Sequence, residues 1–327
     1  GVTGDERIHR VRRMLAEHKG LLLALDDAWN GAALASVVHA LPRNAPLLAT
    51  ARERFPLDEI IEVGQLKPDQ ALTLLGYHVR RRDFSADPDA ARLCELLGYH
   101  AFALEIASKT LKAYDISPTE LLQRIQDAPH DLAMPANFGE LGRTGIKPLL
   151  DASINALNRD QLDVFVTLGG LFEPGATPEL LALTMQRETQ TIHHLLDELD
   201  ARGLVSAQAI SAVPYYRAHD LAYSYSRTMF MSKGLSRQPV IDASRTYARI
   251  HRDDLDALDA EQSSLLEAAQ AAHRLNQTDV LIDIMRQLTV DGPYFAARGH
   301  TSNSLELVRV AIDAAHDDPE TRHYLLS

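Results

Sequence analysis

Two adjacent carboxylates, Asp26 and Asp27, follow the five apolar residues Leu21 to Leu25. An apolar run of this length is typical of a strand that is buried on both faces of a parallel sheet. The carboxylates would then emerge at the carboxyl end of the strand, where open α/β sheets hold ligands. Acids at this position could meet the magnesium ion of a nucleotide. The alternative is a buried strand followed by two ordinary loop acids, because short apolar runs are common.

Other residue types that carry chemistry form fewer patterns. Cys94 is the only cysteine, so the chain cannot form an internal disulfide, and nothing indicates an oxidising compartment. His193 and His194 are adjacent and would face different directions on a helix. The remaining histidines show no metal-ligand spacing.

The elements that must position Asp26 and Asp27 form an alternating pattern. The spacing of apolar residues predicts helices over residues 6–18 and 32–41, and strands over 21–25, 46–50 and 60–63. Helix and strand in alternation at this spacing predict a βαβ layer with a parallel sheet.

From Leu66 onward the pattern predicts helices and one hairpin. Ser117-Pro118-Thr119-Glu120 is a capping box that begins a helix, and residues 127–145, with two prolines and three glycines, form a linker. The other helices are expected from Pro68, over 90–97, 101–111, 149–157 and 160–168, from Thr177, and over 189–201. Strands over 204–207 and 215–218 follow. Helices followed by a small hairpin are the order of a winged-helix domain.

The end of the chain is predicted to be helical throughout. Apolar residues recur at helical spacing over 240–250, 260–275, 279–288 and 302–315. Pairs of amphipathic helices that run on in this way suggest the opening of a helical-repeat array. A plain helical bundle is an equally supported alternative.

Charge bears on the partners of the chain. The formal net charge is −12, and residues 151–227 contain five arginines, no lysine and ten acids. Helix 189–201 carries Asp197, Glu198 and Asp200 but no basic residue, whereas recognition helices use basic and amide side chains. DNA is therefore disfavoured as a partner, and this part is expected to pack on its own chain. No apolar run approaches a membrane span and the start is charged, which predicts a cytoplasmic protein without a membrane partner.

Four motifs together resemble the signal-transduction ATPases with numerous domains (STAND), the group that includes NB-ARC proteins. Leu21 to Trp29 looks like their apolar strand ending in Asp-Asp-x-Trp, and residues 48–52 are similar to the sensor strand ending in Thr-Thr-Arg. Residues 98–104 resemble the motif Gly-x-x-Pro-Leu-Ala-Leu, and residues 216–221 resemble the His-Asp motif that closes the winged helix. The motifs occur in the family's order over about Glu6 to Ser226.

The resemblance implies a role for each matching residue. Asp26 would hold Mg²⁺ through water, and Asp27 would orient or deprotonate the attacking water, which suits phosphoryl transfer. Arg52 would sense the γ-phosphate; its alternative is a surface arginine after a strand. His219 would touch the β-phosphate of bound ADP; its alternative is a histidine that caps the following helix.

Two departures from the family pattern stand out. Ala101 replaces the proline that packs near the adenine, which puts that contact of Ala101 and Phe102 in doubt. No Gly-x-x-x-x-Gly-Lys-Ser/Thr loop occurs in the sequence, although such a loop supplies the N–H groups and the lysine that cradle the phosphates. The intact acidic pair favours a fragment that lacks this segment over a degenerate member. These 327 residues are not expected to bind nucleotide tightly or to hydrolyse it.

The predicted fold class is mainly α with a partial α/β nucleotide-binding layer, a helical domain, a winged helix and a C-terminal TPR-like region. The predicted domains are the C-terminal part of a P-loop domain (1–65), an ARC-like helical bundle (66–130), a linker (131–148), a winged helix (149–230) and the helical tail (231–327).

The predicted function is part of a signalling switch that is closed with ADP and opens with ATP to assemble. Its partners would be an upstream P-loop segment, an effector domain, further copies of itself on activation, and a ligand sensed by the tail. The alternatives are a transcription regulator whose winged helix binds DNA and a structural helical scaffold without a nucleotide role.

Overall fold

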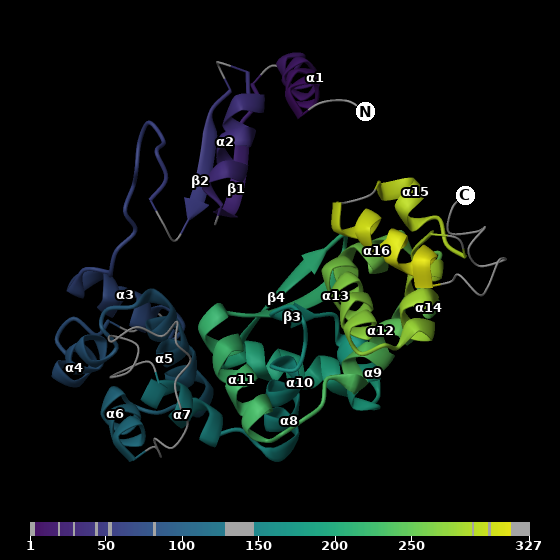
Figure 1. Cartoon of the computed structure of the whole chain (residues 1–327). Coiled ribbons are helices and arrows are strands. Elements are labelled where there is room, and N and C mark those ends of the chain that lie inside the picture. The colour runs from purple at the N-terminus through teal and green to yellow at the C-terminus, as the bar shows by residue number, and fades with distance from the viewer. Residues whose placement is uncertain are drawn as a thin grey trace. The chain divides into compact units, whose positions relative to one another are not determined.

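The computed structural model describes residues 4–18, 20–28, 30–42, 45–51, 54–80, 83–127, 147–289, 291–299 and 302–314. These residues form sixteen helices and five short strands (Figure 1), which confirms the predicted mainly α character. The chain divides into two compact units, unit 1 (Gly1–Gly64) and unit 2 (Gln65–Ser327), and each is described by itself. In the described part of the chain, every helix is too short or too polar to cross a lipid bilayer.

Unit 1 is built on two parallel strands. Its elements are α1 (Gly4–Ala16), β1 (Leu23–Ala28), α2 (Gly31–Ala40) and β2 (Leu47–Ala51). The pairing runs from Leu23 opposite Leu47 to Leu25 opposite Ala49, and the register shifts before Ala28. Asn30 begins α2 because its side-chain oxygen accepts bonds from two backbone N–H groups of the first turn. The predicted strand, helix and parallel strand are thus confirmed.

Two expectations for unit 1 are wrong. The predicted first strand, residues 21–25, is not buried on both faces, since Leu22 is 59% exposed and Ala24 is exposed as well. The reason is that the sheet has two strands among the described residues, so little covers its faces. Residues 60–63 form no strand, and Ile61 and Val63 are 78% and 96% exposed. β-branched residues favour a strand only where a neighbouring strand and a packed face exist, and the described structure provides neither here.

Unit 2 begins with four helices. They are α3 (Pro68–Tyr77), α4 (Pro88–Leu96), α5 (Ala101–Tyr114) and α6 (Pro118–Asp127). The predicted capping box before α6 is confirmed: the Glu120 carboxylate accepts from the Ser117 N–H (2.8 Å), and the Ser117 hydroxyl accepts from the Glu120 N–H (3.2 Å). Residues 128–146 of the expected linker lie outside the described residues, and Lys147 and Pro148 already belong to the next helix.

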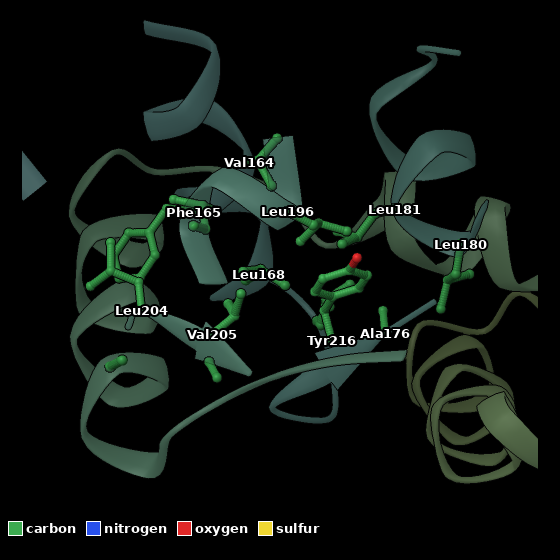
Figure 2. Packing of buried hydrophobic residues seen from close by; sticks show 14 of the residues in the cluster. Val164, Phe165, Leu168, Ala176, Leu180, Leu181, Leu196, Leu204, Val205 and Tyr216 are labelled. Atoms are coloured by element: carbon green, nitrogen blue, oxygen red, sulfur yellow. The ribbon is translucent and has the colours of Figure 1, made fainter. Parts of the chain in front are cut away.

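The next part combines helices with a small antiparallel sheet. Its elements are α7 (Lys147–Asn155), α8 (Arg159–Leu168), β3 (Gly175–Ala176), α9 (Pro178–Met185), α10 (Thr189–Ala201), β4 (Val205–Ile210) and β5 (Val213–Ala218). β5 pairs with both β3 and β4, and the side chains of Asn158 and Thr177 cap α8 and α9. Figure 2 shows its core, where Leu168 of α8, Leu181 of α9 and Leu196 of α10 lie close to the sheet.

The last part consists of helices that follow one another along the chain. They are α11 (Asp220–Ser232), α12 (Gln238–Ile250), α13 (Leu255–Arg274), α14 (Thr278–Thr289), α15 (Tyr294–Arg298) and α16 (Ser302–Ala314). α12 packs against α13 and α14, and α13 packs against α14 and α16. α13 begins five residues before the predicted start because the Asp254 side chain accepts a bond from the Ala257 N–H and caps it.

Candidate functional site

Asp26 of β1 lies beside Thr50 of β2. The parallel register places Leu25 opposite Ala49, so the residues that follow them are neighbours. The Thr50 hydroxyl donates a hydrogen bond to Oδ1 of Asp26 over 2.6 Å, and Asp26 is exposed. A charge-assisted bond of this kind fixes the direction in which the carboxylate points. Two of the motifs thereby meet through their side chains near the carboxyl end of the strand pair.

The Asp26 carboxylate suits a magnesium ion that brings its own phosphate and water ligands. Mg²⁺ in nucleotide sites commonly binds one or two carboxylates, and phosphate oxygens and water fill the other positions. Within the described ranges, no group of three or more His, Cys, Asp or Glu side chains is arranged to hold a metal by itself.

For three residues singled out from the sequence, the side chain lies outside the described part of the structure. The backbone of Asp27 belongs to β1, but its side chain lies outside the described part. Trp29 and Arg52 lie outside the described residues altogether. Thr50 was not predicted to be a partner of Asp26. Thr50 lies in a motif that the sequence shows, but its contact with Asp26 depends on the register of the two strands. Two separate apolar runs do not specify that register.

The second cluster of sequence-predicted residues lies in unit 2. The ring of Phe102, in the first turn of α5, stacks on the imidazole of His219, with centroids 3.6 Å apart and planes 14° from parallel. His219 is also the N-cap of α11, where Nδ1 accepts a bond from the Leu221 N–H at 3.3 Å. Because Nδ1 accepts, the neutral ring carries its proton on Nε2. The capping role considered for His219 is thus real, and the ring also joins two separate motifs.

The residues that lead into Phe102 differ in their surroundings. Ala101, the first residue of α5, is exposed, so the expected adenine contact would involve a small surface side chain. His100, the N-cap of α5, has a buried Nδ1 without a hydrogen-bond partner in the described structure. Burial lowers the pKa of His100, which favours its neutral form near pH 7. His100 was not identified from the sequence, because nothing in its motif indicates burial.

One face of α5 carries the contacts with the sheet-containing part. Phe102, Ile106 and Lys109 lie at helical spacing and so share a face. A Cβ added to Gly203 would come within 3.3 Å of the Ile106 Cα, so the chain between α10 and β4 approaches α5 closely. Lys109 Nζ donates to the Asp200 carbonyl at 3.2 Å and lies 3.6 Å from its carboxylate. α5 therefore contacts the corner between α10 and β4 as well as His219, while the neighbouring helix α6 packs against α7.

The acids of α10 are engaged within the chain. Asp197 accepts a hydrogen bond from the Tyr216 hydroxyl, and Glu198 accepts one from Gln161 Nε2 at 2.6 Å. Asp200 is held by Lys109 as described above. A helix whose charged residues face its own neighbours is poorly suited to enter a DNA groove.

Two arginines of the same part are engaged as well. Arg187 Nη1 lies 2.8 Å from an Asp160 oxygen, and the Arg202 guanidinium lies 4.9 Å from the centre of the Tyr114 ring. Ion pairing and cation–π contact occupy the charges that a phosphate backbone would need.

A scan against protein-family models found no match to this sequence, and a search of curated proteins found none either.

Proposed function

We propose that this chain is part of a nucleotide-dependent signalling switch of the STAND/NB-ARC type. The observation that carries the proposal is the stack of Phe102 on His219. These residues belong to two different motifs of the resemblance and are far apart in the sequence. Their direct contact is what a switch needs, because it links the helical part to the start of α11 through a ring that can exchange one partner for another.

The pairing of Asp26 with Thr50 supports the nucleotide side of the proposal. When a nucleotide is bound, its magnesium would neutralise phosphate charge, with Asp26 as the protein carboxylate that holds it. Thr50 keeps that carboxylate in one orientation. Asp27 would orient the attacking water and Arg52 would sense the γ-phosphate, as the resemblance implies.

We further propose that residues 149–230 form a winged helix used for packing within the chain. In support, α8, α9 and α10 are followed by the β4–β5 hairpin, and β3 completes a three-stranded sheet. The acids of α10 and the face of α5 make contacts within the chain. These contacts would use the surface that a DNA-binding winged helix presents to DNA. This favours the switch over the alternative of a transcription regulator that binds DNA itself.

The helices after α11 would form a TPR-like sensor. α12 packs on α13 and α14, and α13 packs on α14 and α16. Contacts of this kind between helices that follow one another along the chain are the neighbour pattern of a helical-repeat array. In the proposed cycle, ADP keeps the switch closed, a ligand is sensed by this tail, and exchange to ATP opens the protein for assembly.

The test is calorimetric titration of ADP and ATP into the protein expressed from its complete gene. The variant His219→Asn keeps an N-cap acceptor at α11 but removes the ring and its Nε2. We expect ADP affinity to fall about tenfold, the effect of losing one hydrogen bond to a charged group worth about 1.5 kcal/mol. ATP affinity should change less, because the ring is assigned to the closed state.

The matched control is His194→Asn, which removes an exposed histidine of α10 whose side chain is 74% exposed. It should leave both affinities unchanged. The proposal is wrong if the unmodified protein binds neither nucleotide, or if His219→Asn and His194→Asn bind ADP equally well.

A further inference from the structure

The strand β4 forms one edge of the small antiparallel sheet, and that edge is unprotected. Among the described residues, β4 pairs with β5 and no further strand lies beyond it. Proteins commonly blunt such an edge with charged side chains, proline, a bulge or a very short strand. β4 has six uncharged residues without proline, and its register with β5 is unbroken. The opposite edge differs, since β3 has only two residues and follows Pro174.

The turn after β4 determines which of its backbone groups point away from β5. Ser211 and Ala212 have φ angles of +48° and +66°, and they connect the paired residues Ile210 and Val213. Two central residues with positive φ define a type I′ hairpin turn. In such a turn the carbonyl before it accepts a hydrogen bond from the N–H after it. The ladder therefore begins with a hydrogen-bonded pair, and every second pair after it is non-hydrogen-bonded.

This alternation leaves Ala207 and Ala209 with backbone groups that point outward. Counted from the turn, both belong to non-hydrogen-bonded pairs, so their N–H and C=O groups face away from β5. A bond on the other side of the sheet confirms the count. The Ala218 N–H donates to the Pro174 carbonyl at 2.8 Å, so Ala218 faces β3, and its partner on β4 is Val205. Ala207 and Ala209 follow Val205 at a spacing of two and can pair with an additional strand.

The edge is exposed and held in place at both ends. Residues 206–209 are exposed, whereas Val205 is buried, so the open part of the edge begins after Val205. At the far end, the Ser211 hydroxyl donates to Oδ2 of Asp259 in α13 at 3.3 Å. α13 contacts β3, β4 and β5, so it lies across the sheet and leaves the edge open. β4 is thus a preformed strand, and a partner would not have to order it.

We propose that β4 pairs with β4 of a second copy of this protein, antiparallel and centred on Gln208. With this centre, Ala207 of each copy lies opposite Ala209 of the other. Their outward N–H and C=O groups would form two hydrogen bonds in each of these two pairs. The two three-stranded sheets would join into one continuous sheet, which is recognition by strand addition.

A second copy fits this edge for two reasons. The outward groups of Ala207 and Ala209 are placed symmetrically about Gln208, so the strand is complementary to itself. The chain has a net charge of −12, and charged parts of its surface would repel a copy of themselves, whereas β4 carries no charge. The pairing needs no nucleotide, so it stands or falls separately from the proposed switch.

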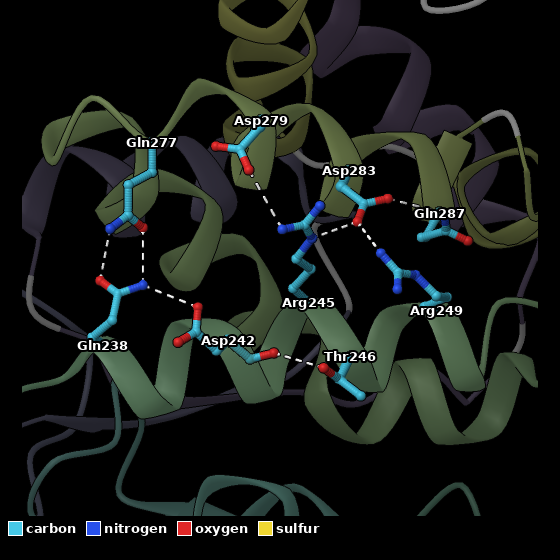
Figure 3. A network of polar contacts seen from close by, with 9 residues as sticks. All are labelled: Gln238, Asp242, Arg245, Thr246, Arg249, Gln277, Asp279, Asp283 and Gln287. Atoms are coloured by element: carbon cyan, nitrogen blue, oxygen red, sulfur yellow. Dashed lines mark hydrogen bonds and ion pairs between the residues drawn. The ribbon is translucent and has the colours of Figure 1, made fainter.

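Gln208 would set the register of the pair. The two Gln208 side chains would lie directly opposite each other in a non-hydrogen-bonded pair, where cross-strand side chains are closest. Opposed glutamines already interact in this protein. Gln238 of α12 and Gln277, just before α14, exchange amide hydrogen bonds of 2.7 and 3.1 Å (Figure 3). The Gln208 amides could interact in the same way across the two copies.

The test is sedimentation velocity without nucleotide, from low to high micromolar concentration. We expect the unmodified protein to show a weak monomer–dimer equilibrium, because one strand pair is a small interface. Gln208→Lys should weaken dimerisation at least about tenfold, because two ammonium groups would meet at the centre of the pair. Gln208→Glu should weaken it similarly through two carboxylates. An equimolar mixture of the two variants should recover dimers, because a lysine then faces a glutamate.

The matched control is Gln190→Lys, which introduces the same charge at an exposed glutamine of α10. It should dimerise like the unmodified protein. Hydrogen exchange followed by NMR gives a second measurement. The N–H groups of Ala207 and Ala209 should become more protected as the protein concentration rises, while those of α5 should not change.

Four results would overturn the proposal. The unmodified protein could remain a monomer at every concentration. Gln208→Lys and Gln190→Lys could dimerise equally, which would place the interface elsewhere. The mixture of Gln208→Lys and Gln208→Glu could fail to recover dimers, which would exclude a pair centred on Gln208. Protection of Ala207 and Ala209 that does not depend on concentration would mean that another segment of the same chain covers the edge.

Discussion

Glu261 is an ionisable residue sealed inside the protein. It lies in α13 with no exposed surface, and one carboxylate oxygen accepts a hydrogen bond from the Thr177 N–H at the start of α9. The other oxygen, Oε2, has no partner within the described structure. Burial raises the pKa of Glu261 to about 7, and the negative charge of Glu173 adds to the effect. Glu261 therefore joins the C-terminal helices to the sheet-containing part through a carboxyl group that titrates near neutral pH.

The stability of unit 2 should depend on pH through Glu261. Its folded pKa lies above its ordinary value of 4.5, so the folded state binds the proton more tightly than the unfolded state. The contribution is fully present below pH 4.5 and is lost as pH rises to about 7. The loss amounts to roughly 3 kcal/mol in the free energy of unfolding. Urea denaturation at pH 5, 6, 7 and 8 measures it.

The variant Glu261→Gln isolates this effect from the other groups that titrate in the same range. Glutamine keeps an acceptor for the Thr177 N–H and cannot ionise, so the variant should gain stability relative to the unmodified protein as pH rises from 5 to 8. Glu95→Gln, at an exposed position of α4, should follow the unmodified protein at every pH. A constant difference between Glu261→Gln and the unmodified protein would contradict the prediction.

Single residues were predictable where they belong to a local motif. Asp26 and His219 could be singled out as candidates because their neighbours in the sequence form recognisable motifs. Thr50, His100 and Glu261 were not, because their roles come from contacts with residues that the sequence does not place beside them. Glu261 in particular lies in a helix of mixed alanine and acid residues, where nothing distinguishes a buried acid from an exposed one.

Between elements, Gly203 packs closely against α5. A second glycine, Gly234, has a similar backbone conformation without such packing, so the two positions can be compared. Gly203 and Gly234 both have positive φ angles, of +76° and +64°. A Cβ on Gly203 would lie 3.1 Å from Lys109 Cδ and 3.3 Å from Ile106 Cα, whereas a Cβ on Gly234 would meet nothing within 4 Å. The two positions therefore differ in packing and not in conformation.

Alanine at both positions should cost about 1 kcal/mol in the left-handed region. Gly203→Ala should lose roughly 1–3 kcal/mol more, because the backbone of α5 must move away. Chemical denaturation of the two variants gives the difference. Equal losses would mean that α5 and the α10–β4 corner are not packed as tightly as the geometry indicates.

Helices were more predictable than strands for a physical reason. A cap such as Asn158 or Ser117 acts within four residues, so its signal is complete in the local sequence. A strand depends on a partner elsewhere in the chain. Residues 60–63 have strand-forming side chains but no neighbouring strand in the described structure, and the first strand lacks the covering layers that its apolar run predicts.

At the scale of the whole molecule, the two units differ in how much core they contain. The cluster of buried hydrophobic residues runs from Ala71 to Ala311, all within unit 2. Among the described residues of unit 1, the buried hydrophobic side chains are Leu34 and Leu41. The sequence predicted apolar elements in both units, but composition does not reveal which of them find partners to cover them.

This difference predicts that the units open independently and with different free energies. Amides of β1 and β2 should exchange hydrogen faster than those of α5, because local opening costs little where few apolar side chains are buried. Leu34→Ala should speed exchange throughout unit 1 and leave unit 2 unchanged. Leu104→Ala, at a fully buried position of α5, should lower the stability of unit 2 by about 2–5 kcal/mol and leave unit 1 unchanged. Hydrogen exchange followed by mass spectrometry resolves both. If either variant accelerates exchange equally in the two units, the chain unfolds as one cooperative body and the division at Gly64 has no energetic meaning.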